Sequence, residues 1–92
     1  MLHLVAYDIA DDARRLRVAK ALLDYGVRVQ ESVFECLVAN EAKVAEMIDR
    51  LRELIEPEED AVRIVPVCAA CTGKLVILGR GEPTKDPDVY VV

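Results

Sequence analysis

The order of the apolar patterns along this chain restricts its fold more than any other feature. Residues 2–9 (LHLVAYDI) have apolar side chains on both faces, which is typical of a strand inside a sheet. A helix is expected next, because Asp11 or Asp12 can cap its start and Gly26 can stop it after about residue 25. Residues 27–38 (VRVQESVFECLV) are extended, either as one kinked strand or as two short strands around a tight reversal.

The second half of the chain repeats this alternation with a clearer helix. Residues 41–55 are expected to be helical, and residues 61–67 (AVRIVPV) form a strand in which Pro66 indicates an edge or irregular end. Residues 74–78 (KLVIL) and 89–92 (VYVV) are predicted to be two further strands, separated by a loop of glycines and prolines. The buried stripe of the helix is expected to contain Val44, Met47, Ile48, Leu51, Leu54 and Ile55.

Strand, helix, extended segment, helix and strand predict a small α+β sandwich, in which an antiparallel sheet carries two helices on one face. Two helices cannot cover both faces of such a sheet. The second extended segment nevertheless has apolar side chains on both faces, with Phe34, Cys36 and Val38 on one and Val33 and Leu37 on the other. An uncovered apolar face predicts a second copy against it, so we expect a homodimer.

Composition excludes several classes of protein. With 92 residues and 53% hydrophobic residues, the chain is expected to be one small folded domain. No apolar run approaches membrane-spanning length, and the first eight residues (MLHLVAYD) do not resemble a signal peptide. Three cysteines, an odd number, argue against a secreted disulfide framework. We therefore expect a cytoplasmic protein without membrane contact.

The net charge of −5 belongs to one element. Residues 41–60 contain eight acidic and three basic residues, so this segment alone carries the net charge of the chain. The simplest interpretation is a solvated helix face. A basic patch that binds nucleic acid can still exist elsewhere, because the distribution of charge matters more than its sum.

The first helix is expected to divide its arginines between two sides. Its apolar positions are Leu16, Ala19, Leu22 and Leu23, with Val18 beside them. Arg15 lies on that side, so its side chain either packs its stem on the core with the charge in water, or reaches back toward Asp8 at the strand end. Arg14 and Arg17 are expected to point outward.

Asp8 is the unexpected residue of the first strand, because it follows Tyr7 inside an apolar run where a charge is costly. A strand-end carboxylate can simply begin a turn or pair with Arg15. At a two-fold axis, however, two copies of Asp8 would repel each other unless they shared a proton or a cation. Mg²⁺ binds one or two carboxylates and keeps waters, one of which supplies a nucleophile without a histidine. The single histidine, His3, is interpreted as a packed strand residue.

Residues 7–35 (YDIADDARRLRVAKALLDYGVRVQESVFE) resemble the CRISPR-associated protein two family, and the resemblance continues through 64–68 (IVPVC) and 88–92 (DVYVV). It implies a ferredoxin-like βαββαβ fold, a symmetric dimer and a last strand that joins the sheet of the partner. The chain then divides into a ferredoxin-like domain, 1–80, and a C-terminal loop and strand, 81–92, that packs on the dimer partner.

The resemblance also implies the residues of the site. Asp8 matches a strand-end aspartate that faces its copy across the dimer and binds Mg²⁺, for which Mn²⁺ can substitute. The expected catalytic residues are Asp8, Tyr7 and Arg15. The residues expected to contact nucleic acid are Arg14, which the helix spacing adds, and Arg17, Arg28, Phe34 and Ser32, which match the family.

The activity implied by the resemblance is metal-dependent endonuclease cleavage of single-stranded RNA or double-stranded DNA during the acquisition of new CRISPR spacers. The alternative is a non-catalytic DNA-binding scaffold that bridges dimers of the CRISPR integrase, protein one. A regulatory domain for a small ligand is a third, weaker reading, because the sequence contains no glycine-rich loop that supports it.

The cysteines of residues 68–71 (CAAC) have the spacing of metal ligands, but a single pair is only half of a tetrahedral zinc site. Cys36 or a partner chain would have to supply the other ligands. Packing or an unremarkable turn is the favoured interpretation of Cys68 and Cys71, because cysteine is so often simply buried.

Overall fold

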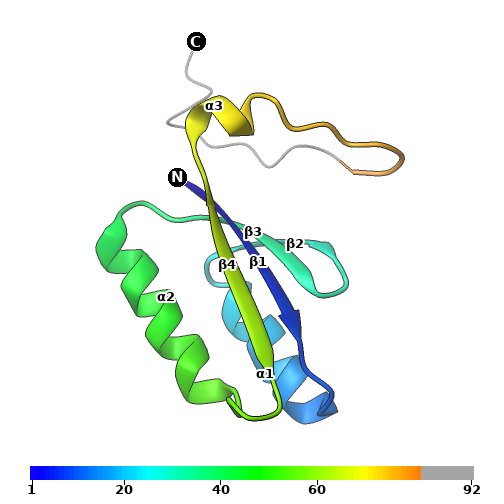
Figure 1. Cartoon of the computed structure of the whole chain (residues 1–92), viewed down its shortest axis with the longest axis vertical. Coiled ribbons are helices and arrows are strands. Elements are labelled where there is room, and N and C mark those ends of the chain that lie inside the picture. Colours follow the sequence, from blue (N-terminus) through cyan, green and yellow to red (C-terminus); the bar gives the residue numbers. More distant parts are fainter. Residues whose placement is uncertain (82–92) are drawn as a thin grey trace.

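A four-stranded antiparallel sheet carries two helices on one of its faces (Figure 1). The computed structural model describes residues 1–81. Its strands lie in the order β2-β3-β1-β4. The elements are β1 (Leu2–Asp8), α1 (Asp12–Leu22), β2 (Gly26–Gln30), β3 (Val33–Leu37), α2 (Glu41–Leu54), β4 (Ala61–Val67) and α3 (Ala69–Thr72). The predicted ferredoxin-like βαββαβ sandwich is confirmed.

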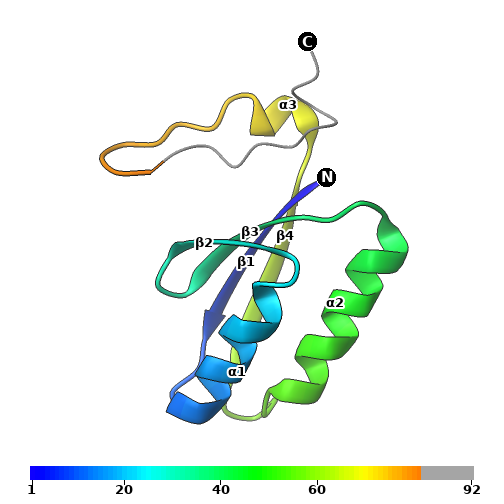
Figure 2. The ribbon, with the colours of Figure 1, turned by 180° about the vertical axis from the view of Figure 1, so that it is seen from behind.

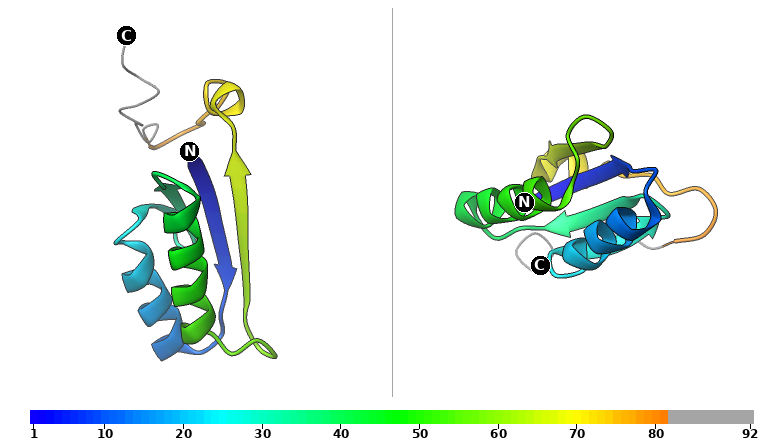
Figure 3. Two further views of the ribbon diagram at one scale, coloured as in Figure 1. Left: turned by 90° about the vertical axis from the view of Figure 1, so that its left-hand side faces the viewer. Right: turned by 90° about the horizontal axis from the view of Figure 1, so that it is seen from below.

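Helices α1 and α2 lie next to each other on the same side of the sheet, and no helix of residues 1–81 covers the opposite face (Figures 2 and 3). The core fills the space between these layers. Its largest fully buried side chains are Phe34, Leu22, Met47, Val5, Val18 and Cys36. On β3, Phe34 and Cys36 face the helices, while Val33 and Leu37 are only partly buried on the other face, as the alternation of a strand requires.

The buried side of α1 agrees with the prediction at Ala19 and Leu22 but not at Leu16 and Leu23. Leu16 and Leu23 are 55% and 61% exposed, whereas Val18 and Leu22 are fully buried. Successive residues of a helix are turned by about 100°, so Leu16 and Val18 lie on nearly opposite sides and only one can face the sheet. Val18 faces it because Ala21 and Leu22 extend that side toward β3 and α2.

Helix α1 also ends earlier than predicted, at Leu22, and Gly26 is the first residue of β2. Gly26 does not stop the helix, because the described glycines with a positive φ are Gly79 and Gly81. Its role is close packing instead. A Cβ atom at position 26 would lie 2.2 Å from the Glu35 carbonyl oxygen and 2.6 Å from the Cys36 Cα. Only glycine allows β2 to approach β3 this closely.

The extended segment 27–38 consists of two strands, β2 and β3, joined by Glu31 and Ser32. Neither connecting residue has a positive φ, so the tight hairpin turns that need one are absent here. The pairing instead shifts by one residue between Arg28 and Gln30. Such a bulge bends the strand and changes the direction of side chains beside it.

Helix α2 and strand β4 agree with the predictions. Asn40 caps α2 by accepting a hydrogen bond from the Lys43 backbone N–H, and Met47 and Leu51 are its buried residues. The other members of the predicted stripe are partly buried. Strand β4 lies at the edge of the described sheet and pairs only with β1, with Pro66 opposite His3. Proline lacks a backbone N–H and is tolerated at such an edge strand, as predicted.

Residues 74–78 do not form the predicted strand. The chain leaves β4 through the short helix α3 and then runs without regular structure to residue 81. This segment faces the side of the sheet opposite the helices, across a cavity of about 650 Å³ that Leu4 and Val33 also line. The described sheet contains four strands, and this segment pairs with none of them. The predicted strand 89–92 and almost all of the predicted C-terminal segment 81–92 lie outside the described residues.

Candidate functional site

Asp8 is the last residue of β1 and lies on the face of the sheet that the helices leave open. Along β1, Val5 and Tyr7 are buried on the helix side, whereas Ala6 is partly exposed and Asp8 is exposed. None of the side-chain hydrogen bonds or ion pairs within residues 1–81 involves Asp8. The carboxylate is therefore available to a ligand, and the expectation of a buried charge at this position is wrong for a single chain.

Arg15 reaches the strand end as predicted but does not pair with Asp8. Its Nη1 donates to the Ile9 carbonyl oxygen at 3.0 Å, and its Nη2 pairs with the carboxylate of Asp12. The backward lean of helical side chains explains the direction, and Asp12, one turn earlier on the same helix, is the nearer carboxylate. The guanidinium holds the β1–α1 connection in place and keeps 42% of its side chain exposed.

Arg14 is not the outward-pointing cation that the spacing predicted. Its Nε donates to Asp60 Oδ2 at 2.8 Å, and its Nη2 donates to Glu59 Oε2 at 2.8 Å. The Asp60 side chain is fully buried and also accepts a hydrogen bond from the Glu56 backbone N–H. These interactions raise the pKa of Arg14, and Arg14 together with the Glu56 N–H lowers the pKa of Asp60 below its usual range. Arg14 thus ties α1 to the start of β4.

Tyr7, Phe34 and Arg28 form one cluster at the β2–β3 hairpin. The Tyr7 hydroxyl donates to the Glu31 carbonyl oxygen and accepts from Arg28 Nη2, both at 3.2 Å. The guanidinium carbon of Arg28 lies 5.4 Å from the centre of the Phe34 ring, within the range of a cation–π interaction. The Ser32 carbonyl oxygen accepts from the Tyr7 backbone N–H at 3.1 Å. The cluster fixes an exposed arginine on a rigid hairpin.

Phe34 itself has no exposed surface, so in this conformation it cannot stack on a base. It belongs to the side of β3 that faces the helices, and its effect on any ligand passes through Arg28. Arg15 and Arg28, which are 13 residues apart in the sequence, line one small cavity of about 280 Å³ together with Asp12, Leu16 and Glu31. Arg17 is exposed on α1 and has no ion pair within the described residues.

A metal site is not complete within the described part of the chain. Among residues 1–81 there is no group of three or more histidine, cysteine, aspartate or glutamate side chains that could hold an ion. The predicted site requires Asp8 from two copies, and its donor chemistry fits Mg²⁺, which binds one or two carboxylate oxygens and keeps several waters. His3 is buried and its Nδ1 lies 3.1 Å from the Met1 carbonyl oxygen, which agrees with its interpretation as a packed residue.

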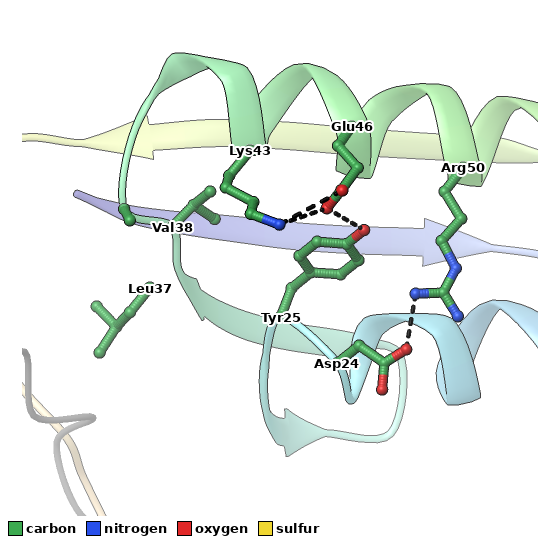
Figure 4. Close-up of a pocket in the computed structure, with 8 residues that line it drawn as sticks. Asp24, Tyr25, Leu37, Val38, Lys43, Glu46 and Arg50 are labelled. Atoms are coloured by element: carbon green, nitrogen blue, oxygen red, sulfur yellow. Dashed lines mark hydrogen bonds and ion pairs between the residues drawn. The ribbon is translucent and has the colours of Figure 1, made fainter.

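A second polar cluster, not anticipated from the sequence, joins the end of α1 to α2 (Figure 4). Arg50 Nη1 donates to Asp24 Oδ2 at 2.7 Å, and the Tyr25 hydroxyl donates to Glu46 Oε2 at 3.0 Å. The Arg50 guanidinium also lies over the Tyr25 ring. The cations of this cluster, Arg50 and Lys43, both have carboxylate partners, so the cluster joins two helices and offers little free charge to a phosphate. No motif marks it, because its residues are far apart in the sequence.

The three cysteines are in two environments. Cys36 is buried in the core between β3 and the helices, and burial raises the pKa of its thiol to about 11. Cys68 and Cys71 are both exposed: Cys68 immediately precedes α3, and Cys71 lies within it. Cys36 therefore does not join the other two in a metal site.

The chain is similar to known proteins over most of its length. The family described as CRISPR associated protein Cas2 matches residues 1–75. The CRISPR-associated endoribonuclease Cas2 1 of Chloroflexus aurantiacus is 43% identical, over 100% of this chain and 100% of its own. The CRISPR-associated endonuclease Cas2 2 of Thermus thermophilus is 45% identical over 99% of this chain and 96% of its own.

Two solved structures extend this similarity to three dimensions. The crystal structure of Streptococcus pyogenes Cas2 at pH 6.5 matches with a TM-score of 0.76 and 33% identity, covering 86% of this chain and 100% of that one. A chain of a partial Cas6-RT-Cas1–Cas2 complex has the same fold, with a TM-score of 0.58 and 22% identity over 68% of this chain and 76% of its own.

Proposed function

This chain belongs to the CRISPR associated protein Cas2 family, and from this premise we propose that it is a Mg²⁺-dependent endonuclease that cleaves RNA or DNA during spacer acquisition. The observation that carries the proposal is Asp8: an exposed carboxylate at a strand end, without a partner among residues 1–81, on the face that has no helix. An exposed carboxylate without a partner is available to a divalent cation such as Mg²⁺.

The site is proposed to form between two copies of the chain. Asp8 of each copy would bind the same Mg²⁺ ion, and the bound ion would supply an activated water and neutralise charge on the phosphate. The partly exposed apolar side chains on the open face, among them Val33 and Leu37, support a homodimer that brings the two Asp8 residues together. Two uncompensated carboxylates in contact would otherwise repel each other.

The remaining residues of the site are proposed to bind and orient the nucleic acid. Arg17 and Arg28 would contact phosphates, because both are exposed and neither has an ion pair within the described residues. Arg15 is paired with the exposed carboxylate of Asp12, so it would stabilise negative charge on the phosphate by exchanging that partner for the phosphate, from the cavity that it shares with Arg28. Tyr7 acts as a positioning residue, since its hydroxyl holds the Arg28 guanidinium. Arg14 is not included among the residues proposed to bind nucleic acid, because its guanidinium is already paired with Asp60 and Glu59.

The relatives carry the names endoribonuclease and endonuclease, so both RNA and DNA are substrates to test. A scaffold that bridges dimers of the integrase Cas1 is the second proposal. It is supported by the fold shared with a chain of a Cas1–Cas2 complex and by the fact that residues 1–81 contain no complete metal site. The scaffold requires the dimer and its arginines but not the carboxylate of Asp8.

The experiment that separates the two proposals compares Asp8→Asn with wild type in two assays, cleavage of single-stranded RNA and double-stranded DNA, and spacer acquisition with Cas1. Loss of cleavage together with loss of acquisition supports the nuclease. Acquisition without cleavage supports the scaffold. Asp11→Asn is the matched control, because asparagine also caps a helix and can replace the Asp11 carboxylate that accepts from the Arg14 N–H.

A further inference from the structure

The two exposed cysteines lie on a single turn of the chain. Cys68 is the residue before α3, and Cys71 is the third residue of that helix. The turn is closed by the Thr72 backbone N–H, which donates to the Cys68 carbonyl oxygen at 2.9 Å, and by the Thr72 hydroxyl, which donates to the same oxygen at 3.0 Å. Thr72 is buried, so the turn that carries the cysteines is anchored on its inner side while both thiols face solvent.

This spacing suits a disulfide. Residues three apart on a helical turn have Cβ atoms about 5–6 Å apart. Cysteines joined by a disulfide have Cα atoms about 4.4–6.8 Å apart and Cβ atoms about 3.5–4.5 Å apart, so only a small adjustment of the turn is needed. Gly73, directly after the helix, has φ −69 and ψ −12, so no strained residue opposes such an adjustment.

The two thiols also differ in reactivity. Hydrogen bonds from the Cys71 backbone N–H and thiol lower the pKa of Cys68, and the same side-chain contact raises the pKa of Cys71. Thiolates, not thiols, attack disulfides, so Cys68 is the better nucleophile and Cys71 the second thiol to react. The buried Cys36, whose pKa is raised by its surroundings, lacks both the exposure and the thiolate needed for this chemistry.

We propose that Cys68 and Cys71 are a reversible redox site, which forms an intramolecular disulfide by exchange with a small-molecule disulfide of the glutathione type. The Cys68 thiolate attacks one sulfur of oxidised glutathione, forms a mixed disulfide and releases one glutathione thiolate. Cys71, after losing its proton, then attacks the Cys68 sulfur and releases the second glutathione. Two protein thiols and one glutathione disulfide become one protein disulfide and two glutathione thiols.

The location gives this exchange a structural consequence. Helix α3 connects β4 to residues 73–81 (Figure 1), and side chains of this segment line one cavity together with Leu4 and Val33 on the open side of the sheet. A bond between positions 68 and 71 would fix the turn from which that segment leaves the domain. The oxidation state would therefore change the freedom of residues 73–81 relative to the open face, without touching the core or Asp8.

The test uses the full 92-residue chain in buffers with increasing ratios of oxidised to reduced glutathione, followed by alkylation and intact-mass measurement. The expected result is that two thiols disappear together, with the mass falling by two hydrogens, and that dithiothreitol restores them. Peptide mapping should place the bond between Cys68 and Cys71 and leave Cys36 as a thiol. Cys71→Ser should instead stop at one bound glutathione on Cys68.

Three results would overturn the proposal. One is a wild-type protein that keeps bound glutathione, since Cys71 would then not reach Cys68. Another is a disulfide that involves Cys36 or joins two chains. The third is Cys71→Ser and Cys68→Ser taking up glutathione at equal rates, which would show that the thiols are not differentiated. Both substitutions are at exposed positions, and circular dichroism checks that each variant is folded.

Discussion

The guanidinium of Arg14 holds the buried carboxylate of Asp60 through two hydrogen bonds, Nε to Oδ2 at 2.8 Å and Nη2 to Oδ1 at 3.1 Å, across 46 positions of sequence. This pair fixes α1 against the connection between α2 and β4. It also removes Arg14 from the proposed nucleic-acid surface, for which the sequence had predicted it. The remaining candidates, Arg17 and Arg28, are cations whose charge is not already matched within residues 1–81.

The first prediction concerns stability in acid. Because Arg14 lowers the pKa of Asp60 in the folded protein, the contribution of the pair is complete above about pH 4 and is lost as pH falls through the lowered pKa. Asp60→Asn should lower the melting temperature at pH 7, and this difference from wild type should shrink below about pH 4. Glu59→Gln, at an exposed partner of the same arginine, should change stability by less than about 0.5 kcal/mol. An equal effect of both variants would contradict the prediction.

The second prediction tests the close approach of β2 and β3. Gly26→Ala should destabilise the fold by about 1–3 kcal/mol or more, because the new Cβ would overlap the backbone of Glu35 and Cys36. Gly73→Ala is the matched control, since its Cβ would meet atoms no closer than 3.6 Å and its φ of −69 suits alanine. Chemical denaturation measures both variants. A Gly26→Ala variant as stable as Gly73→Ala would show that the strands can separate without cost.

The third prediction concerns the arginines. Arg17→Gln and Arg28→Gln should each weaken nucleic-acid binding regardless of sequence and reduce the slope of log K against log salt by about 1. Tyr7→Phe should weaken binding less, because it removes only the hydroxyl that positions Arg28. Fluorescence anisotropy at several salt concentrations provides the slopes. Arg52→Gln, on the far helix and paired with Asp49, is the control, and an effect there equal to that of Arg17→Gln would place the surface on α2.

The fourth prediction concerns the metal. Cleavage should disappear with EDTA and return with Mg²⁺ or Mn²⁺, whereas binding of nucleic acid should persist without metal because the arginines supply it. Asp8→Asn should abolish cleavage at every metal concentration and leave the thermal stability of the dimer unchanged or raised, since it removes a repulsion between two carboxylates. Metal-independent cleavage by purified protein, undiminished in Asp8→Asn, would refute the proposed site.

The fifth prediction is a homodimer at micromolar concentration, in which the partner covers the apolar open face. Equilibrium sedimentation should give twice the mass of the chain. Leu37→Lys, on the open face of β3, should favour the monomer because it places a charge in the interface. Lys20→Glu, at an exposed position of α1 on the helix side, should leave the dimer intact. A monomeric wild type would remove the basis for a shared Asp8 site.

The patterns of the sequence determined the order of the elements and most of their limits. The buried stripe of α2 and the position of strand β4 were predictable from the sequence. In each, apolar residues recur with the period of the element, 3.6 residues for a helix and two for a strand. The two faces of β3 followed in the same way, since Phe34 and Cys36 alternate with Val33 and Leu37. The fold class followed from the order in which these elements occur.

The tertiary structure decided which residues contact one another. A local period in the sequence indicates which side of an element is apolar, but it does not indicate which other element will pack against that side. Leu16 and Val18 both fit an apolar side of α1, and only packing on the sheet selected Val18. Arg14 and Asp60 meet because α1 and the start of β4 are neighbours in space. Residues 74–78 have the composition of a strand, yet they pair with none of the four strands of the described sheet. Asp8 has no partner for the same reason: the open face offers it none among residues 1–81.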